Sequence, residues 1–269
     1  MELPAQPRLV LLRGLIRSRF HWEQFPTYLQ QALPDFELVI PELAGNGERY
    51  QEQTPFSVHG MMEDIRQQVR LQQQQPPEQQ PQEQQQTHNQ PVIIIAVSMG
   101  AMIASEWARC YPQEIKQLHL INTSFSNLSL PWQRMQAPAF FSLLSHFFNR
   151  EKLEQAIIRW TINLYNDPQL TTRWQNFSAT HPLSYRNAIA QLLSASRYKG
   201  PTTAPVADSY FYNSPQDKLV SGRCTERIAG KWQKPLFSHK SAGHDLPLDD
   251  PYWLITNIKN NIEAVSQND

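Results

Sequence analysis

A serine stands at a sharp junction between a predicted strand and a predicted helix. The apolar, β-branched run 92–97 predicts a strand buried on both faces of a sheet, and residues 102–111 predict a helix. Ser98 lies between them, followed by Met99, Gly100 and Ala101. Such a tight turn would hold the serine hydroxyl clear of the backbone as a nucleophile. Serine is also a favoured helix N-cap, so the turn by itself fits both roles.

Two other side chains suited to catalysis, Asp217 and His244, also come directly after predicted strands. These strands are predicted at 206–212 and 235–239. Because the carboxyl ends of parallel strands meet at one edge of a sheet, all three side chains are expected there. A serine hydroxyl is a weak nucleophile at neutral pH and needs a base. We therefore expect His244 to accept the proton of Ser98, and Asp217 to orient the imidazole.

The elements that must position these groups alternate between strand and helix. Further strands are predicted at 8–12, 36–41 and 115–121, and further helices at 21–33, 56–71, 220–229 and 251–265. Repeated strand–helix units predict an α/β fold, with a mostly parallel central sheet and helices on both faces. Between residues 124 and 200 the alternation stops, and helices are predicted instead at 138–149, 151–166 and 184–198. We expect residues 1–123 and 201–269 to form the core, and 124–200 to form a helical cap.

Composition restricts the possible partners. The chain has 269 residues, a formal net charge of zero and no block rich in lysine or arginine, which argues against nucleic acid or an anionic membrane as the main partner. The Gln- and Pro-rich tract 72–90 predicts a flexible insertion. Cys110 and Cys224 are expected to be reduced thiols, and no cluster of residues has metal-ligand spacing. No membrane span or signal peptide is predicted, so a soluble cytoplasmic protein is expected.

Five motifs in this order resemble the α/β-hydrolase fold, of the capped single-domain esterase and lipase type. They are Arg13-Gly14-Leu15 with His21-Trp22, the run 41–47 (PELAGNG), the run 96–100 (AVSMG), the run 214–220 (SPQDKLV) and the run 242–245 (AGHD). The resemblance covers nearly the whole chain, and the order serine, acid, histidine is that of the fold. It implies a serine hydrolase that cleaves a carboxylic ester or thioester through an acyl-enzyme, without a cofactor.

The resemblance also implies an oxyanion hole. The backbone N–H of Met99, at the start of the helix, is one expected donor, and by resemblance the N–H of Leu15 is the other. Residues of the first motif and aromatic residues of the cap are expected to contact a partly apolar small-molecule substrate: Arg13, Trp22, Phe140, Phe141 and Trp160. The chain departs from the usual pattern at Arg13, where His is common, and at Ala96 and Ala101, where glycine is common.

Several alternatives stay open at this stage. His239 competes with His244 as the base, and Asp208 and Asp245 are weaker candidates for the acid. The same triad can run lyase or C–C bond chemistry, for which a cationic pocket built from Arg13 or Arg17 would favour an anionic metabolite. The chain could also be a non-catalytic binding scaffold, although a scaffold has no need of a complete triad. The sequence does not determine the oligomeric state or the substrate.

Overall fold

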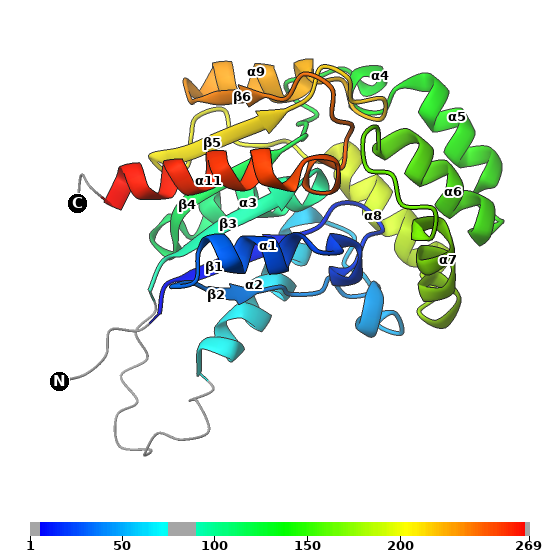
Figure 1. Cartoon of the computed structure of the whole chain (residues 1–269), viewed down its shortest axis with the longest axis horizontal. Helices are drawn as coiled ribbons and strands as arrows, with labels where there is room; N and C mark the ends of the chain where they lie inside the picture. Colours follow the sequence, from blue (N-terminus) through cyan, green and yellow to red (C-terminus); the bar gives the residue numbers. More distant parts are fainter. Residues whose placement is uncertain (1–5, 75–89, 267–269) are drawn as a thin grey trace.

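The computed structural model describes residues 6–74 and 90–266, and its centre is a sheet of six parallel strands (Figure 1). The strand order is β2-β1-β3-β4-β5-β6, and every neighbouring pair is parallel. The strands are β1 (Arg8–Leu12), β2 (Glu37–Val39), β3 (Val92–Val97), β4 (Ile115–Ile121), β5 (Asp208–Asn213) and β6 (Leu236–Ser238). The predicted α/β class with a parallel sheet is confirmed.

Helices cover both faces of this sheet. Helices α1 (Phe25–Ala32) and α11 (Pro251–Ser266) pack together on one face, where Trp22 and Leu254 belong to the same buried cluster. Helices α2 (Val58–Gln74), α3 (Met99–Cys110) and α9 (Arg223–Trp232) cover the other face. Strand β3 is buried along its whole length, as its uninterrupted apolar sequence predicts.

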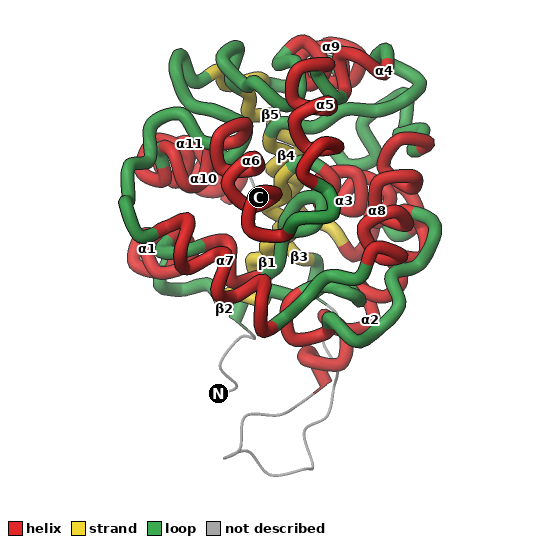
Figure 2. The backbone as a smooth tube through the Cα atoms, turned by 90° about the vertical axis from the view of Figure 1, so that its right-hand side faces the viewer, coloured by secondary structure: helices red, strands yellow, loops and turns green. Residues whose placement is uncertain are grey.

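Five helices between β4 and β5 lie beyond the carboxyl ends of the strands (Figures 1 and 2). They are α4 (Pro131–Arg134), α5 (Ala137–His146), α6 (Arg150–Thr161), α7 (Leu170–Thr180) and α8 (Tyr185–Arg197). We call residues 124–200, which contain them, the cap. Three helices were predicted here. The prediction missed α4 and α7, and it extended the second helix to residue 166, although α6 ends at Thr161.

Some element boundaries differ from the prediction. The predicted helix 21–33 divides into a short 3-10 helix, η1 (Arg19–Trp22), and α1, with Glu23 at φ 49° between them. Pro26 then lies in the first turn of α1, where a missing N–H costs nothing. The Gln-rich tract begins inside α2, which continues to Gln74. The predicted flexibility of the remainder falls on 75–89, which lie outside the described residues.

Buried polar contacts join the cap to the core. Arg17, in the loop after β1, forms an ion pair of 2.9 Å with Glu154 of α6, and its guanidinium lies 4.8 Å from the ring centre of Trp174. Gln191 of α8 accepts a hydrogen bond of 2.8 Å from the backbone N–H of Ile16. These contacts fix α6, α7 and α8 against the loop that follows β1. None of the helices in the described part of the chain is long and apolar enough to cross a membrane.

One buried histidine makes the fold sensitive to acid. His119 of β4 is fully buried, with Nδ1 2.9 Å from the hydroxyl of Tyr212, and burial lowers its pKa to about 3. The unfolded chain takes up this proton below its ordinary pKa of about 6.5, so the stabilisation is complete above pH 6.5 and decreases as the pH falls toward 3. We expect the free energy of unfolding to fall by about 2 kcal/mol between pH 7 and pH 5 from His119 alone.

Urea denaturation at several pH values measures this loss, and His119→Gln should flatten the dependence. Burial and the charges of Arg17 and Arg13 also lower the pKa of His21, which contributes in the same direction and leaves a residual slope. An unchanged slope in the His119→Gln protein would show that this histidine is not the cause.

Candidate active site

Ser98 occupies a strained turn between β3 and α3. Its backbone has φ 57° and ψ −117°, a conformation that a non-glycine residue rarely adopts. The turn is tight enough that a Cβ at Gly100 would lie 2.5 Å from the carbonyl oxygen of Leu12. A Cβ at Gly14 would lie 3.6 Å from the Ser98 hydroxyl oxygen, so the loop after β1 passes directly beside this side chain. This is the geometry of a nucleophile elbow.

His244 and Asp217 form a buried hydrogen-bonded pair. The Nδ1 atom of His244 lies 2.7 Å from Oδ2 of Asp217, and both residues are buried. The other carboxylate oxygen, Oδ1, accepts hydrogen bonds from the backbone N–H groups of Leu219 and Val220 at 2.8 and 2.9 Å. The carboxylate is therefore fixed from both sides, and the imidazole must carry its proton on Nδ1 when it is neutral. Its Nε2 atom is then free to accept a proton.

Two consecutive residues at the end of β4 connect the loops that carry these groups. The hydroxyl of Thr123 donates to the carbonyl oxygen of Ser98 at 2.9 Å. The amide of Asn122 donates to the carbonyl oxygen of His244 at 2.8 Å, and its Oδ1 accepts the N–H of Ser214, in the loop that carries the acid. The sequence analysis missed this role of Asn122. The only available signal was a polar residue at the carboxyl end of a strand.

No hydrogen bond joins the hydroxyl of Ser98 to the imidazole of His244 among the described residues. Catalytic hydrogen bonds often shorten only when a substrate excludes water from the site. The connections through Asn122 and Thr123 hold the backbones of both residues at the same edge of the sheet. What the structure shows directly is therefore the histidine–acid pair and the strained serine.

Two backbone N–H groups beside Ser98 remain unused within the described residues. These belong to Met99, the first residue of α3, and Leu15, which follows Gly14. A helix N-terminus leaves its first N–H groups without an intrahelical acceptor, and it carries a partial positive charge. Both groups therefore have no competing acceptor among the described residues, and their role as oxyanion donors stays a prediction.

Arg13 and Trp22, predicted to contact substrate, lie in the interior. Arg13 forms a two-pronged ion pair with Asp245, with contacts of 2.6 and 3.0 Å, and its guanidinium lies 4.8 Å from the ring centre of Trp22. Trp22 has no exposed surface. Both side chains thus connect the loop after β1 to the loop 239–245, which carries His244 and which we call the histidine loop. The cationic pocket that Arg13 or Arg17 could have formed is neutralised by Asp245 and Glu154.

The three predicted cap residues lie in two different settings. Phe140 and Phe141 of α5 are 40% and 65% exposed. Trp160 of α6 is half-buried, and its indole N–H has no partner among the described residues. The next residue, Thr161, accepts the backbone N–H of Asp245 at 2.8 Å, which brings this end of α6 against the histidine loop. Of the three, Trp160 is the one whose neighbour in the sequence contacts the loop that carries His244.

A small cavity of about 70 Å³ lies between the cap and the loop after β1. Its lining includes Ile16, His21, Phe147, Phe177 and Tyr185. None of the residues predicted to bind substrate, and neither Ser98 nor His244, belongs to this lining. The cavity borders the part of the loop after β1 that contains Leu15, a predicted oxyanion donor, since its lining residue Ile16 directly follows Leu15.

Loss of the Arg13 charge should destabilise the protein strongly. Arg13→Met would leave Asp245 buried without its partner, which typically costs about 3–5 kcal/mol. We expect that loss in the free energy of unfolding, measured by urea denaturation. The double variant Arg13→Met/Asp245→Leu, which removes both charges, should recover most of it. A single variant as stable as the wild type would mean that the pair is not held as the structure has it.

The rival residues from the sequence analysis have other partners. His239 accepts the N–H of Ala242 at Nδ1, and its Nε2 lies 3.1 Å from Asp250. Asp245 pairs with Arg13, and Asp208 stands at the start of β5, away from the carboxyl edge. His239 therefore has partners on both ring nitrogens, whereas Nε2 of His244 has no hydrogen-bond partner among the described residues.

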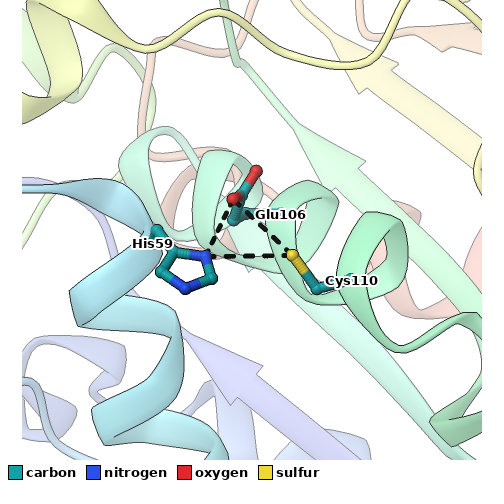
Figure 3. A group of neighbouring side chains, drawn as sticks. All are labelled: His59, Glu106 and Cys110. Atoms are coloured by element: carbon teal, nitrogen blue, oxygen red, sulfur yellow. Dashed lines mark hydrogen bonds and ion pairs between the residues drawn. The ribbon is translucent and has the colours of Figure 1, made fainter.

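A group of possible metal ligands lies away from the carboxyl edge of the sheet. The spacing of these residues in the sequence did not indicate the group. His59 of α2 meets Glu106 and Cys110 of α3, and their ligand atoms lie within 4.8 Å of one another (Figure 3). Arg109, however, already donates to both carboxylate oxygens of Glu106, at 2.6 and 2.9 Å. Burial and the neighbouring Glu106 carboxylate raise the pKa of the Cys110 thiol, so it stays protonated at neutral pH. We interpret the group as an ion-pair network between α2 and α3.

Comparisons with known proteins agree with this fold. Among solved structures, a candidate lipase from Acinetobacter baumannii superposes with a TM-score of 0.77 at 19% identity, covering 99% of this chain and 87% of its own. An esterase from Exiguobacterium antarcticum gives 0.73 at 13%, covering 96% and 92%. A candidate non-haem bromoperoxidase from Mycobacterium tuberculosis gives 0.71 at 16%, also covering 96% and 92%.

At these identities the structural matches establish the fold alone. A search of curated proteins found no match. The family model described as "Alpha/beta hydrolase family" matches residues 9–255, nearly the whole chain. The chain therefore belongs to the alpha/beta hydrolase family.

Proposed function

We propose that this protein is a serine carboxylesterase that cleaves an ester or thioester through an acyl-enzyme. The observation that carries the proposal is the buried contact of 2.7 Å between His244 Nδ1 and Asp217 Oδ2, at the edge where the strained turn presents Ser98. This arrangement leaves Nε2 as the proton acceptor, and a serine nucleophile needs such a base. The family membership supports hydrolase chemistry, and the ester specificity is our inference.

The proposed reaction uses only groups of this chain, the substrate and water. Ser98 Oγ attacks the substrate carbonyl carbon while His244 takes its proton, and the backbone N–H groups of Leu15 and Met99 stabilise the oxyanion. Loss of one such donor typically costs about 3–4 kcal/mol of barrier. The intermediate expels an alcohol or thiol, which receives the proton from His244. Water, activated by the same histidine, then releases the acid and restores Ser98.

The structure gives no support to a second function, lyase or C–C bond chemistry on an anionic metabolite. A cationic pocket built from Arg13 or Arg17 would have favoured such a substrate, and both arginines are paired with carboxylates. Of the cap residues, Trp160 keeps its proposed role as a substrate contact, because it adjoins the histidine loop and its N–H is unused among the described residues.

A fluorophosphonate probe tests the proposal, because it reacts with an activated serine in a folded site. We expect the folded protein to be labelled on Ser98, identified by peptide mass spectrometry, and the urea-denatured protein to be unlabelled. Folded protein without label on Ser98 would favour the non-catalytic scaffold. A panel of short-chain and longer-chain esters and thioesters then tests the substrate class.

A further inference from the structure

The outer helix of the cap, α5, exposes a stripe of large apolar side chains. Of its residues, only Ala139 is buried. Phe140, Phe141 and Leu144 are 40%, 65% and 53% exposed, and Phe148, just beyond the helix, is 78% exposed. Residues separated by four positions share one face of a helix, so Phe140, Leu144 and Phe148 form a continuous line. Helix α5 contains no charged residue other than a histidine at its end.

A second stripe runs along α8. Tyr185, Ile189, Leu192 and Leu193 are 36–44% exposed, at the i, i+4, i+7 and i+8 spacing of one helix face. The opposite face of α8 is buried and carries Asn187, Ala190, Gln191 and Ser194. The helix thus turns its polar side toward the core and its apolar side outward, the reverse of a surface helix in water.

The two stripes meet. The rings of Phe148 and Tyr185 lie 5.4 Å apart, and Phe147 contacts both rings. The end of α5 therefore adjoins the start of α8, and both helices belong to the side of the molecule that faces the viewer in Figure 2. We call the eight exposed residues the cap face: Phe140, Phe141, Leu144, Phe148, Tyr185, Ile189, Leu192 and Leu193. Scattered apolar residues are normal on a surface, but a joined set on two neighbouring helices indicates a binding surface.

The charge of the cap differs from that of the rest of the chain. Residues 124–200 contain eight lysines and arginines and three carboxylates, a formal charge of +5 in a chain whose net charge is zero. No carboxylate occurs in 124–150 or in 168–200, the stretches that carry α5 and α8. Six exposed cations of the cap form no ion pair with the described residues: Arg150, Lys152, Arg159, Arg186, Arg197 and Lys199.

We propose that the cap face binds the surface of an anionic lipid bilayer or aggregate. An interfacial helix inserts its apolar side chains among the acyl chains while neighbouring cations meet the anionic headgroups. Both halves of that requirement are present here, because α5 and α8 turn aromatic and aliphatic side chains outward, and α8 and the neighbouring α6 carry the cations without ion pairs. A second copy of the chain is disfavoured as the occupant, because the two caps would bring +5 against +5.

The net charge of the whole chain argued against an anionic membrane as the main partner, and this proposal revises that expectation. The net charge is zero only because the core carries −5, which compensates the +5 of the cap. The binding goes beyond the proposed esterase activity and does not depend on it, since it requires no reaction at Ser98. A protein whose Ser98 is inert would still bind lipid.

Vesicle co-sedimentation with the full chain tests the proposal. We expect Ser98→Ala protein to bind vesicles of phosphatidylcholine with phosphatidylglycerol, more weakly as salt is raised, and to bind pure phosphatidylcholine much less. Phe141→Ser/Phe148→Ser changes two side chains that are mostly exposed, so the fold should tolerate it. This variant should reduce partitioning to anionic vesicles at least about ten-fold. Tyr252→Ser, at a residue of α11 that is 64% exposed, is the matched control and should bind like its parent.

Any of three results would overturn the proposal. The first is no binding to the anionic vesicles, and the second is binding that the double phenylalanine variant leaves unchanged. The third is a dimer in analytical ultracentrifugation that the double variant dissociates, without lipid binding, which would assign the cap face to a second copy. Fluorophosphonate labelling of Ser98 is measured on the wild-type protein, so failure of lipid binding and failure of the esterase proposal can be told apart.

Discussion

Replacing Ser98 with alanine should reduce kcat for ester hydrolysis at least about 10⁴-fold, because no other group can form the acyl-enzyme. Residual turnover would come from the oxyanion donors and from substrate binding alone. The strained φ of 57° at this position is retained by alanine, which carries the same Cβ, so the fold should not collapse. Steady-state kinetics on a p-nitrophenyl ester, with urea denaturation as a check of folding, measures both effects.

A matched serine provides the control. Ser105 lies in α3, the helix that begins directly after Ser98. It is buried and donates to the backbone carbonyl oxygen of Ala101 at 2.7 Å. Ser105→Ala should alter stability modestly and leave kcat within about two-fold. Full turnover by the Ser98→Ala protein would defeat the proposed mechanism, however well the remaining geometry fits.

Replacing Asp217 with asparagine should reduce kcat about 10⁴-fold with little change of shape. The amide oxygen can still accept the N–H groups of Leu219 and Val220, which leaves its NH₂ group facing His244. The imidazole must then accept at Nδ1 and carry its proton on Nε2, where it cannot act as a base. The loss should appear in kcat more than in KM, since substrate binding does not use this carboxylate.

The chain offers an internal comparison for this prediction. Asp250 contacts Nε2 of His239 at 3.1 Å, which makes a second histidine–aspartate pair near the end of β6. Asp250→Asn should leave kcat nearly unchanged, because His239 uses its Nδ1 atom to accept the N–H of Ala242. If Asp250→Asn inactivates the protein while Asp217→Asn does not, the base has been assigned to the wrong histidine.

Local pattern predicted the sheet well and the boundaries of several helices poorly. The limits of β1, β3 and β4 match the prediction. Strands β1 and β3 are short apolar runs, whereas β4 also contains buried polar residues, Gln117 and His119. Helix α7 was missed, since its sequence LTTRWQNFSAT buries only Leu170 and Trp174 and so has a weak apolar period. The break before α1 depends on Glu23 at φ 49°, which no residue type signals in advance.

In the site, too, local patterns predicted some residues, whereas contacts between residues far apart in the sequence could not be predicted. Ser98, Asp217 and His244 could be proposed as the catalytic residues because each follows a strand, and parallel strands bring such positions to one edge. The pair of Arg13 and Asp245 joins residues 232 positions apart, and its formation depends on packing that no local pattern encodes. For the same reason Arg13 was predicted to face the substrate, whereas the structure places it in an interior ion pair.

The amide of Asn122 restricts how this active site can change over evolutionary time. Its NH₂ group donates to the carbonyl oxygens of Gly243 and His244, at 3.2 and 2.8 Å. A carboxylate at this position would have no proton to donate and would oppose two carbonyl dipoles. Moving the proposed acid from the end of β5 to this position at the end of β4 would therefore leave the carbonyl oxygens of Gly243 and His244 without their donor, so the loop that carries His244 would have to change as well.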